Sequence, residues 1–257
     1  MLVVVSPAKR LDETRPGRAE TRPDFASDAT YLAGVAGDLG APALRKLMKI
    51  SDNLARLNAS RFVQFQADPD LGTLHRAVDI FAGDTYAGLE AATLNDDALR
   101  WAQGHLRILS GLYGLLRPLD GIQPYRLEMG SHLSTDRGRN LYQYWADRLA
   151  LALNDAAQQV GAKALINCAS VEYFSAVDPA ALKLRVVTPV FMEQRGEEAK
   201  IVSFFAKKAR GAMARFIVEN RLTDVDAIRE FDTGGYRFRP DMSEGDRWVF
   251  LRDYPEA

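Results

Sequence analysis

Short, strongly apolar runs alternate along the chain with longer segments in which apolar positions recur every three or four residues. The first run, residues 2–5, follows the initiator methionine directly and predicts a buried strand. Other short runs of Val, Ile, Leu and Phe predict strands at residues 163–168, 184–192, 200–205 and 247–252. These runs give five expected strands, spread from one end of the chain to the other.

Helical periodicity begins near Pro42, a residue that suits the first turn of a helix. Ser51 then predicts the N-cap of a second helix, in which we expect Leu54, Leu57 and Phe62 to face inward. Residues 42–66 therefore predict two short helices joined by a tight turn.

Other segments differ in how clearly they indicate helix. Residues 10–40 are rich in Thr, Pro, Asp and Gly and predict a surface excursion with at most one short helix. Further helices are expected at residues 95–109, 140–160 and 203–217, with a short helix opening at Thr223.

Expected strands and helices are interleaved throughout, without a low-complexity linker or an internal repeat. With 47% hydrophobic residues, this order predicts one compact α/β domain of mixed strands and helices over residues 1–257. No apolar run reaches the roughly 18 to 20 residues that a membrane helix needs. The apolar start lacks the charged leader of a signal peptide, so we expect a cytoplasmic protein.

Several longer stretches carry a family resemblance. They are residues 2–9 (LVVVSPAK), 50–62 (ISDNLARLNASRF), 109–129 (LSGLYGLLRPLDGIQPYRLEM), 141–145 (LYQYW), 166–174 (INCASVEYF) and 201–222 (IVSFFAKKARGAMARFIVENRL). In these stretches the chain resembles the YaaA family of peroxide-stress proteins. The resemblance implies a compact α/β fold with a helix-hairpin-helix element and a positively charged cleft. It also implies binding to duplex or structured DNA and a role in limiting iron-dependent damage during peroxide stress.

The net charge of −1 provides no overall attraction for nucleic acid, so DNA binding requires local segregation of charge. Residues 203–217 contain no acid, and at about 100° per residue their cations share one arc opposite the apolar residues. Gly211 falls near the middle of this arc, where it lets a phosphate approach closely. The alternative is an ordinary solvated helix face. The four cations are Lys207, Lys208, Arg210 and Arg215.

The two-helix segment at residues 42–66 is the candidate helix-hairpin-helix element. Such an element holds a DNA backbone through main-chain N–H groups at its turn and through nearby cations. Its turn, residues 49–52, contains no glycine, which departs from the usual motif. The alternative location is the turn at Gly111 to Gly114, but the following Arg117-Pro118 disfavours a second helix and suggests a structural turn with a buried Tyr113. The cations of the favoured segment are Arg45, Lys46, Lys49, Arg56 and Arg61, against one acid, Asp52.

Polar residues at strand ends form a third group, because the carboxyl ends of parallel strands commonly line one ligand crevice. Lys9 and Glu172 are candidate catalytic residues, with Lys9 as a Schiff-base nucleophile in an enzyme acting on a base, nucleoside or abasic site. The alternative is a structural ion pair between Lys9 and an acid. The other expected pocket residues are Ser6, Arg126, Glu128, Asn167, Ser170 and Tyr173.

Metal and redox chemistry have little support in the sequence. The three histidines, His75, His105 and His132, lie far apart, and no Cys/His/Glu cluster has ligand spacing, so we expect no metal and no cofactor. The one cysteine, Cys168, lies in an apolar run and is expected to be buried. The leading hypothesis is a monomeric protein that binds DNA phosphates with little sequence preference.

Overall fold

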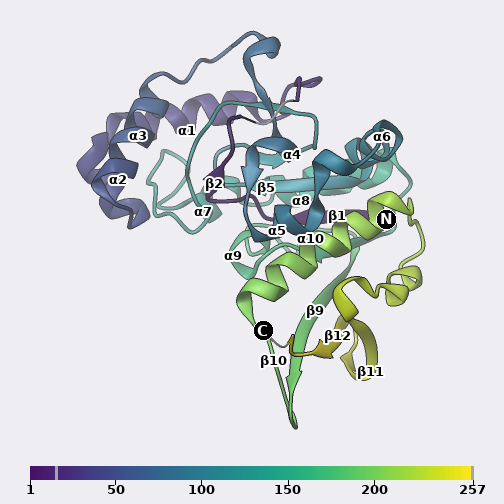
Figure 1. The fold of residues 1–257 in the computed structure, drawn as a ribbon. Helices are drawn as coiled ribbons and strands as arrows, with labels where there is room; N and C mark the ends of the chain where they lie inside the picture. The colour runs from purple at the N-terminus through teal and green to yellow at the C-terminus, as the bar shows by residue number, and fades with distance from the viewer. Residues whose placement is uncertain (15–16, 256–257) are drawn as a thin grey trace.

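A central eight-stranded sheet organises the computed structural model, which describes residues 1–14 and 17–255 (Figure 1). The strand order is β11-β12-β9-β8-β1-β5-β6, with β10 paired to β9. Neighbouring strands from β12 through β5 run parallel, whereas β6, β10 and β11 are antiparallel to their partners. The strands are β1 (Leu2–Val5), β5 (Leu106–Ser110), β6 (Gly114–Leu116), β8 (Ala164–Cys168), β9 (Arg185–Arg195), β10 (Glu198–Lys200), β11 (Arg237–Glu244) and β12 (Arg247–Asp253).

The middle of the sheet forms the core. Every residue of β1, β5 and β8 is buried, because helices and loops cover both faces. Val3 lies between Leu106 and Ile166 in the parallel register. The expected strands at 2–5, 163–168, 184–192 and 247–252 are confirmed. The expected strand at 200–205 is wrong, because β10 ends at Lys200 and a helix begins at Ser203.

Helices surround this sheet, and the longest, α10, crosses in front of it in Figure 1. Three helices, α1 to α3, gather at one end of the molecule, while the β9–β10 hairpin extends from another. The helices are α1 (Ala26–Asp38), α2 (Gly40–Met48), α3 (Asp52–Val63), α4 (Ala77–Ile80), α5 (Asp84–Leu89), α6 (Asp96–His105), α7 (Leu141–Trp145), α8 (Arg148–Gln159), α9 (Val171–Phe174) and α10 (Ser203–Glu219). Two small strand pairs join β2 (Arg10–Leu11) to β4 (Phe81–Ala82) and β3 (His75–Arg76) to β7 (Gly121–Ile122).

Three helix predictions need correction. Residues 10–40 contain the 13-residue helix α1, longer than expected, which buries Leu32 and three alanines. The helix expected at 140–160 is interrupted at Ala146, whose φ of 45° is incompatible with a continuous right-handed helix. Helix α6 begins close to the expected start, with Asn95 as its N-cap, but ends at His105 and not at residue 109, because the chain enters β5 there.

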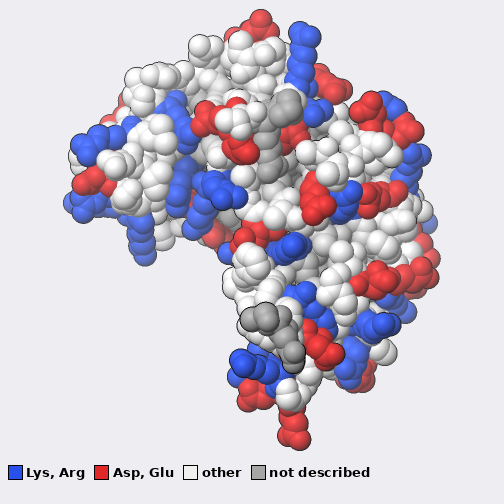
Figure 2. Space-filling view, in the orientation of Figure 1, with Lys and Arg blue, Asp and Glu red and all other residues white. Residues whose placement is uncertain are grey.

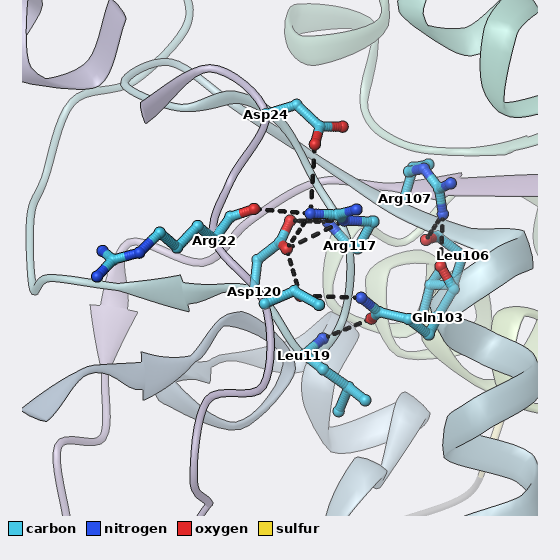
Figure 3. A network of polar contacts seen from close by, with 9 residues as sticks. Arg22, Asp24, Gln103, Leu106, Arg107, Arg117, Leu119 and Asp120 are labelled. Atoms are coloured by element: carbon cyan, nitrogen blue, oxygen red, sulfur yellow. Dashed lines mark hydrogen bonds and ion pairs between the residues drawn. The ribbon is translucent and has the colours of Figure 1, made fainter. Parts of the chain in front are cut away.

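A polar network fixes the loop after β6 (Figure 3). The Asp120 carboxylate accepts hydrogen bonds from the backbone N–H of Arg117 at 2.7 Å and from its guanidinium at 2.9 Å. Arg117 also donates to the carbonyl of Arg22 at 2.7 Å, and the side chain of Gln103 holds the Leu119 backbone N–H at 2.9 Å. Burial raises the pKa of Asp120, and the bonds from Arg117 oppose this shift. The hydrogen bonds of these side chains therefore hold the loop in place.

Across the part of the chain that the structure describes, no helix combines the length and apolar character needed to cross a membrane.

Candidate functional site

The ends of β1 and β8 meet at the carboxyl edge of the sheet. Ser170 donates its backbone N–H to Ser6 Oγ at 2.8 Å, and the two hydroxyl oxygens lie 3.2 Å apart. Ser170 also caps α9 by accepting from the Tyr173 N–H. On the other side, Tyr86 donates its hydroxyl to the Ser6 carbonyl at 3.2 Å. The two segments that the sequence placed at one strand edge therefore lie together.

Glu128 is the carboxylate at the centre of this edge. Its Oε1 accepts hydrogen bonds from Arg126 Nε at 3.1 Å and Nη2 at 2.9 Å, and Lys9 Nζ lies 3.6 Å away. Glu128 is only 8% exposed, whereas the Lys9 side chain is 66% exposed. Within residues 1–14 and 17–255, no donor reaches Glu128 Oε2, although that oxygen is buried. The acid paired with Lys9 is thus Glu128 and not Glu172.

Two buried tyrosines lie beside Glu128 and line the same shallow depression. Tyr125 shares a 2.6 Å hydrogen bond with Ser110 Oγ, which also accepts from the Tyr113 N–H. Burial raises the pKa of the Tyr125 and Tyr173 phenols far above physiological pH, so both rings stay neutral. The depression is lined by Pro7, Ala8, Lys9, Tyr125, Arg126, Leu127, Glu128 and Tyr173.

Glu172 and Asn167 have local bonding roles. Glu172 accepts a hydrogen bond from the Gly130 backbone N–H at 3.1 Å. Asn167 accepts from the Ala169 N–H at 3.1 Å and donates to Thr188. Neither side chain lines the depression beside Glu128. The structure therefore brings Lys9, Arg126, Glu128 and Tyr173 together, whereas Ser6 and Ser170 bond to each other and do not line the depression.

The basic arc of α10 is divided by another helix. The backbone of Gly211 packs against Thr85 of α5, so the middle of the arc is buried and not open to a phosphate. Arg215 donates to the carbonyls of Leu89 and Glu90 and to Glu219. The prediction that all four cations share an open face is therefore wrong.

The remaining cations of α10 have different surroundings. Burial lowers the pKa of Arg210, which is partly enclosed near Cys168. Lys207 and Lys208 are exposed, and no acid within the described ranges pairs with either. Of the four predicted residues, Lys207 and Lys208 are therefore the two whose side chains are open to contact from a phosphate in solvent.

Helices α2 and α3 pack against each other around a short turn. Lys49 ends α2 in the left-handed conformation, with φ 53°, and the N–H of Ile50 bonds to the Arg45 carbonyl at 3.2 Å. Ser51 caps α3 by accepting from the Leu54 N–H at 3.4 Å, which confirms the expected cap. A tight turn thus forms without glycine because Lys49 adopts the conformation that glycine usually takes.

The cations of this segment divide into paired and free groups. Arg45 bonds Asp52 at 2.8 Å, and Arg61 pairs with Glu13. Lys46, Lys49 and Arg56 are exposed, and they have no ion pair among residues 1–14 and 17–255.

The burial of the apolar residues in α3 differs in part from the prediction. Phe62 is buried as expected, but Leu54 and Leu57 are 38% and 45% exposed. Ala55 and Asn58 occupy the inner face in their place, where α3 packs on α1.

The Gly111 to Gly114 turn is structural. A Cβ on Gly111 would lie 2.4 Å from the Leu127 carbonyl, and Gly114 has a φ of 66°. Trp145 donates its indole N–H to the Gly111 carbonyl at 3.1 Å, and Tyr113 is buried. This turn packs in the core and cannot approach DNA.

Two groups of polar residues escaped the sequence reasoning. Tyr125 and Ser110 lie within the stretch 109–129, so the resemblance marked the region without marking their bond. Asp28 accepts hydrogen bonds from Tyr144, Arg137 and Arg148, joining α1 to residues more than 100 positions away.

In the described parts of the chain, no three His, Cys, Asp or Glu side chains are grouped in a way that could hold a metal ion.

Comparison with known proteins places these features in a family context. Residues 1–242 match the family described as peroxide stress protein YaaA. A UPF0246 protein of Roseobacter denitrificans is 60% identical over 259 residues, covering 100% of both chains. Another, from Ruegeria pomeroyi, is 60% identical over 254 residues, covering 99% of both chains. A third, from Dinoroseobacter shibae, is 57% identical over 258 residues, covering all of this chain and 97% of that one.

Proposed function

This chain belongs to the YaaA family of peroxide stress proteins, and from that premise we propose that it binds duplex or structured DNA through phosphate contacts. In this proposal it limits iron-dependent DNA damage during peroxide stress. Contacts to phosphates supply affinity without reading the base sequence. The observation that carries the proposal is the set of unpaired cations around the α2–α3 turn.

Three features of that turn support its use as a helix-hairpin-helix element. The first turn of α3, a 12-residue helix, presents backbone N–H groups that lack partners within the helix, and the helix dipole favours an anion there. Lys46, Lys49 and Arg56 surround this end without acidic partners among the described residues. Asp52 is the one acid in the first turn, and its ion pair with Arg45 offsets part of its repulsion for a phosphate.

A second group of cations lies at the start of α10. Lys207 and Lys208 are exposed and unpaired within the described residues. Figure 2 shows Lys and Arg side chains gathered over the α2–α3 end, and the outline of the molecule is indented between that end and the β9–β10 hairpin. A duplex seated in this indentation is the arrangement that we propose as the positively charged cleft.

The proposed role in peroxide stress acts through DNA. In this proposal the effect on iron chemistry is indirect and comes from protection of the DNA, not from storage of iron by the protein. Protein bound along the DNA backbone would hinder the access of iron to phosphates and bases.

The test is a gel-shift titration of a Lys49→Ala/Arg56→Ala variant with duplex and branched DNA at several salt concentrations. We expect weaker binding, with a salt slope smaller by about one unit for each phosphate that the variant no longer neutralises. The matched control is Lys163→Ala/Lys183→Ala, which removes two exposed cations next to the amino ends of β8 and β9. Equal binding by the α2–α3 variant and the control would contradict the proposal.

A second candidate function is an enzyme that acts on a base, nucleoside or abasic site. The observation that favours it is the approach of Lys9 Nζ to Glu128 at 3.6 Å beside two buried tyrosines. Glu128 takes the place of Glu172 in this version of the hypothesis. Trapping of a covalent adduct, described in the Discussion, tests it.

A further inference from the structure

The start of α10 carries an exposed aromatic side chain at one end of a row of three rings. Phe204 is 55% exposed, and its ring packs edge-on against Phe205, with the ring centroids 5.5 Å apart. Phe205 in turn packs edge-on against Tyr254 at 5.8 Å, and Tyr254 is 38% exposed. The row therefore joins α10 to the residue that follows β12, and it presents an exposed ring at each end.

The middle ring of the row is fixed by a mostly buried cation. The guanidinium of Arg252 lies 4.6 Å from the centroid of Phe205, and its side chain is only 15% exposed. Arg252 is itself held by the buried carboxylate of Glu193, 3.4 Å from its Nε, and by the carbonyl of Gly234, which accepts from its Nη1 at 3.1 Å. The two exposed rings are thus supported on a preorganised base, which lowers the entropy lost when a ligand binds.

Cations flank the row at both ends. Lys207 and Lys208 follow Phe204 by three and four residues, the spacing that places side chains next to each other on a helix surface. At the other end, the guanidinium of Arg195 lies over the ring of Tyr254, 5.3 Å from its centroid. All three cations are exposed, and no acid in the described parts of the chain pairs with any of them. The row therefore suits a polyanion that also has flat apolar faces.

Single-stranded DNA combines these two properties. Aromatic side chains stack on any of the four bases, while cations along the strand attract its phosphates. In a duplex the neighbouring base pairs cover both faces of each base, so the exposed rings have no access to them. A purely apolar partner would use the rings and leave the three cations without anions.

We propose that this row of rings binds single-stranded DNA, with one base stacked on Phe204 and another on Tyr254. The phosphates beside these bases contact Lys207, Lys208 and Arg195. This inference goes beyond the proposed duplex binding, because the rings act on unpaired bases and lie outside the α2–α3 turn. Lys207 and Lys208 serve both forms of DNA, whereas the rings serve unpaired bases alone.

The test measures fluorescence anisotropy of a labelled deoxythymidine 12-mer, a strand that cannot form Watson–Crick pairs with itself. Phe204→Ala should weaken binding about tenfold, and Phe204→Leu should be as weak, because it restores apolar bulk without a stacking face. Phe204→Trp keeps such a face and should bind at least as tightly as the wild type. The matched control is Leu151→Ala, which shortens a 45% exposed apolar side chain on α8 and should bind as the wild type does.

Tyr254→Ala tests the other end of the row and should also weaken binding of the 12-mer about tenfold. Lack of binding by the wild-type protein would overturn the proposal. Full affinity in Phe204→Leu would overturn it too, because the contact would then be apolar docking and not stacking on a base.

Duplex binding is measured in parallel so that the two proposals can fail separately. Lys49→Ala/Arg56→Ala should lose affinity for the duplex and keep its affinity for the 12-mer, whereas Phe204→Ala should show the reverse. Equal losses for both ligands in a folded Phe204→Ala variant would contradict a site specific for unpaired bases.

Discussion

Gly211 of α10 packs directly against the backbone carbonyl of Thr85 in α5. A Cβ at position 211 would lie 1.7 Å from that oxygen, and a Cβ on Gly88 would lie 2.0 Å from the carbonyl of Lys208. The two glycines therefore allow α5 and α10 to approach more closely than any larger residue permits. Helix α10 is thus enclosed by the sheet on one side and by α5 on the other.

Gly211→Ala should destabilise the protein, because the added methyl group meets backbone atoms that cannot turn aside. We expect a loss of about 3 kcal/mol in the free energy of unfolding, measured by urea denaturation. Gly34→Ala is the matched control, since a Cβ at that exposed position in α1 meets nothing within 4 Å. The control should gain about 0.5 kcal/mol through lower entropy of the unfolded chain. A stable Gly211→Ala variant would show that α5 and α10 are not packed as described.

Lys207→Ala/Lys208→Ala should weaken DNA binding and leave stability unchanged, because both side chains are exposed. The slope of log affinity against log salt should fall by about two units in gel-shift assays.

Arg215→Ala should have the opposite effect, with lower stability and nearly unchanged DNA binding. It removes hydrogen bonds to two carbonyls and to Thr93, so we expect stability to fall by about 2 kcal/mol with little change in salt slope. The reverse pattern would show that Arg215 contacts DNA.

Strands β1, β8, β9 and β12 of the central sheet could be predicted from the sequence, whereas β5 lies mostly within the helix expected at residues 95–109. Residues 2–5 and 164–168 are apolar runs whose composition leaves little alternative to a covered strand. The edge strand β11 was missed, because none of its residues is fully buried and its composition resembles that of a loop. Its position depends on pairing with β12, a tertiary contact that no local pattern reveals.

The candidate site could be predicted only in part. The convergence of Ser6 and Ser170 follows from the parallel register of β1 and β8, and that geometry is general to α/β sheets. The choice of Glu128 over Glu172 as the neighbour of Lys9 depends on the path of residues 124–129, which have no regular secondary structure. Gly211 was misread for a related reason. A glycine on a basic face suggests phosphate contact, but the helix that covers it lies over 100 residues earlier in the chain.

Asp28 should make stability depend on acid pH. Burial favours the neutral carboxyl, but hydrogen bonds from Arg148 and Tyr144 outweigh it and hold the pKa of Asp28 below its ordinary value of 3.8. Because the folded pKa is the lower one, the stabilisation is complete above the unfolded value and is lost as pH falls from about 4 through the folded pKa. Asp28→Asn should cost about 3 kcal/mol at pH 7.

Urea denaturation of the wild type and of Asp28→Asn at a series of pH values checks this prediction. The difference between wild type and Asp28→Asn in urea midpoint should narrow steadily below pH 4. Asp241→Asn is the control, since the Asp241 carboxylate is exposed and its partner Arg239 is only half-buried, and it should leave the midpoint unchanged. A difference in urea midpoint that stays constant between pH 6 and pH 2.5 would show that Asp28 does not contribute to the loss of stability in acid.

Cys168 should play no part in peroxide protection. Burial raises the pKa of its thiol to about 12, and peroxide reacts with the thiolate form. Cys168→Ala should therefore restore peroxide survival to a strain lacking the protein as well as the wild type does. Iodoacetamide should label the thiol in urea but not in the native state.

Elemental analysis of the purified protein should find well under one iron per chain, and a stoichiometric value would require a metal site.

Lys9 provides the test that separates binding from catalysis at the strand edge. Reactive lysines are usually held in pockets that exclude water, so that the neutral amine can attack a carbonyl. Lys9 is instead 66% exposed and lies 3.6 Å from a carboxylate, which favours a role in holding an anion. We expect that incubation with DNA containing an abasic site, followed by borohydride, traps no covalent adduct. Lys9→Ala should also unfold at nearly the same urea concentration as the wild type, because an exposed ion pair contributes only about 0 to 1 kcal/mol. An adduct that forms with the wild type and disappears in Lys9→Ala would establish Lys9 as a nucleophile. In that case Glu128, whose Oε1 lies 3.6 Å from Lys9 Nζ, becomes the candidate for exchanging a proton with the intermediate.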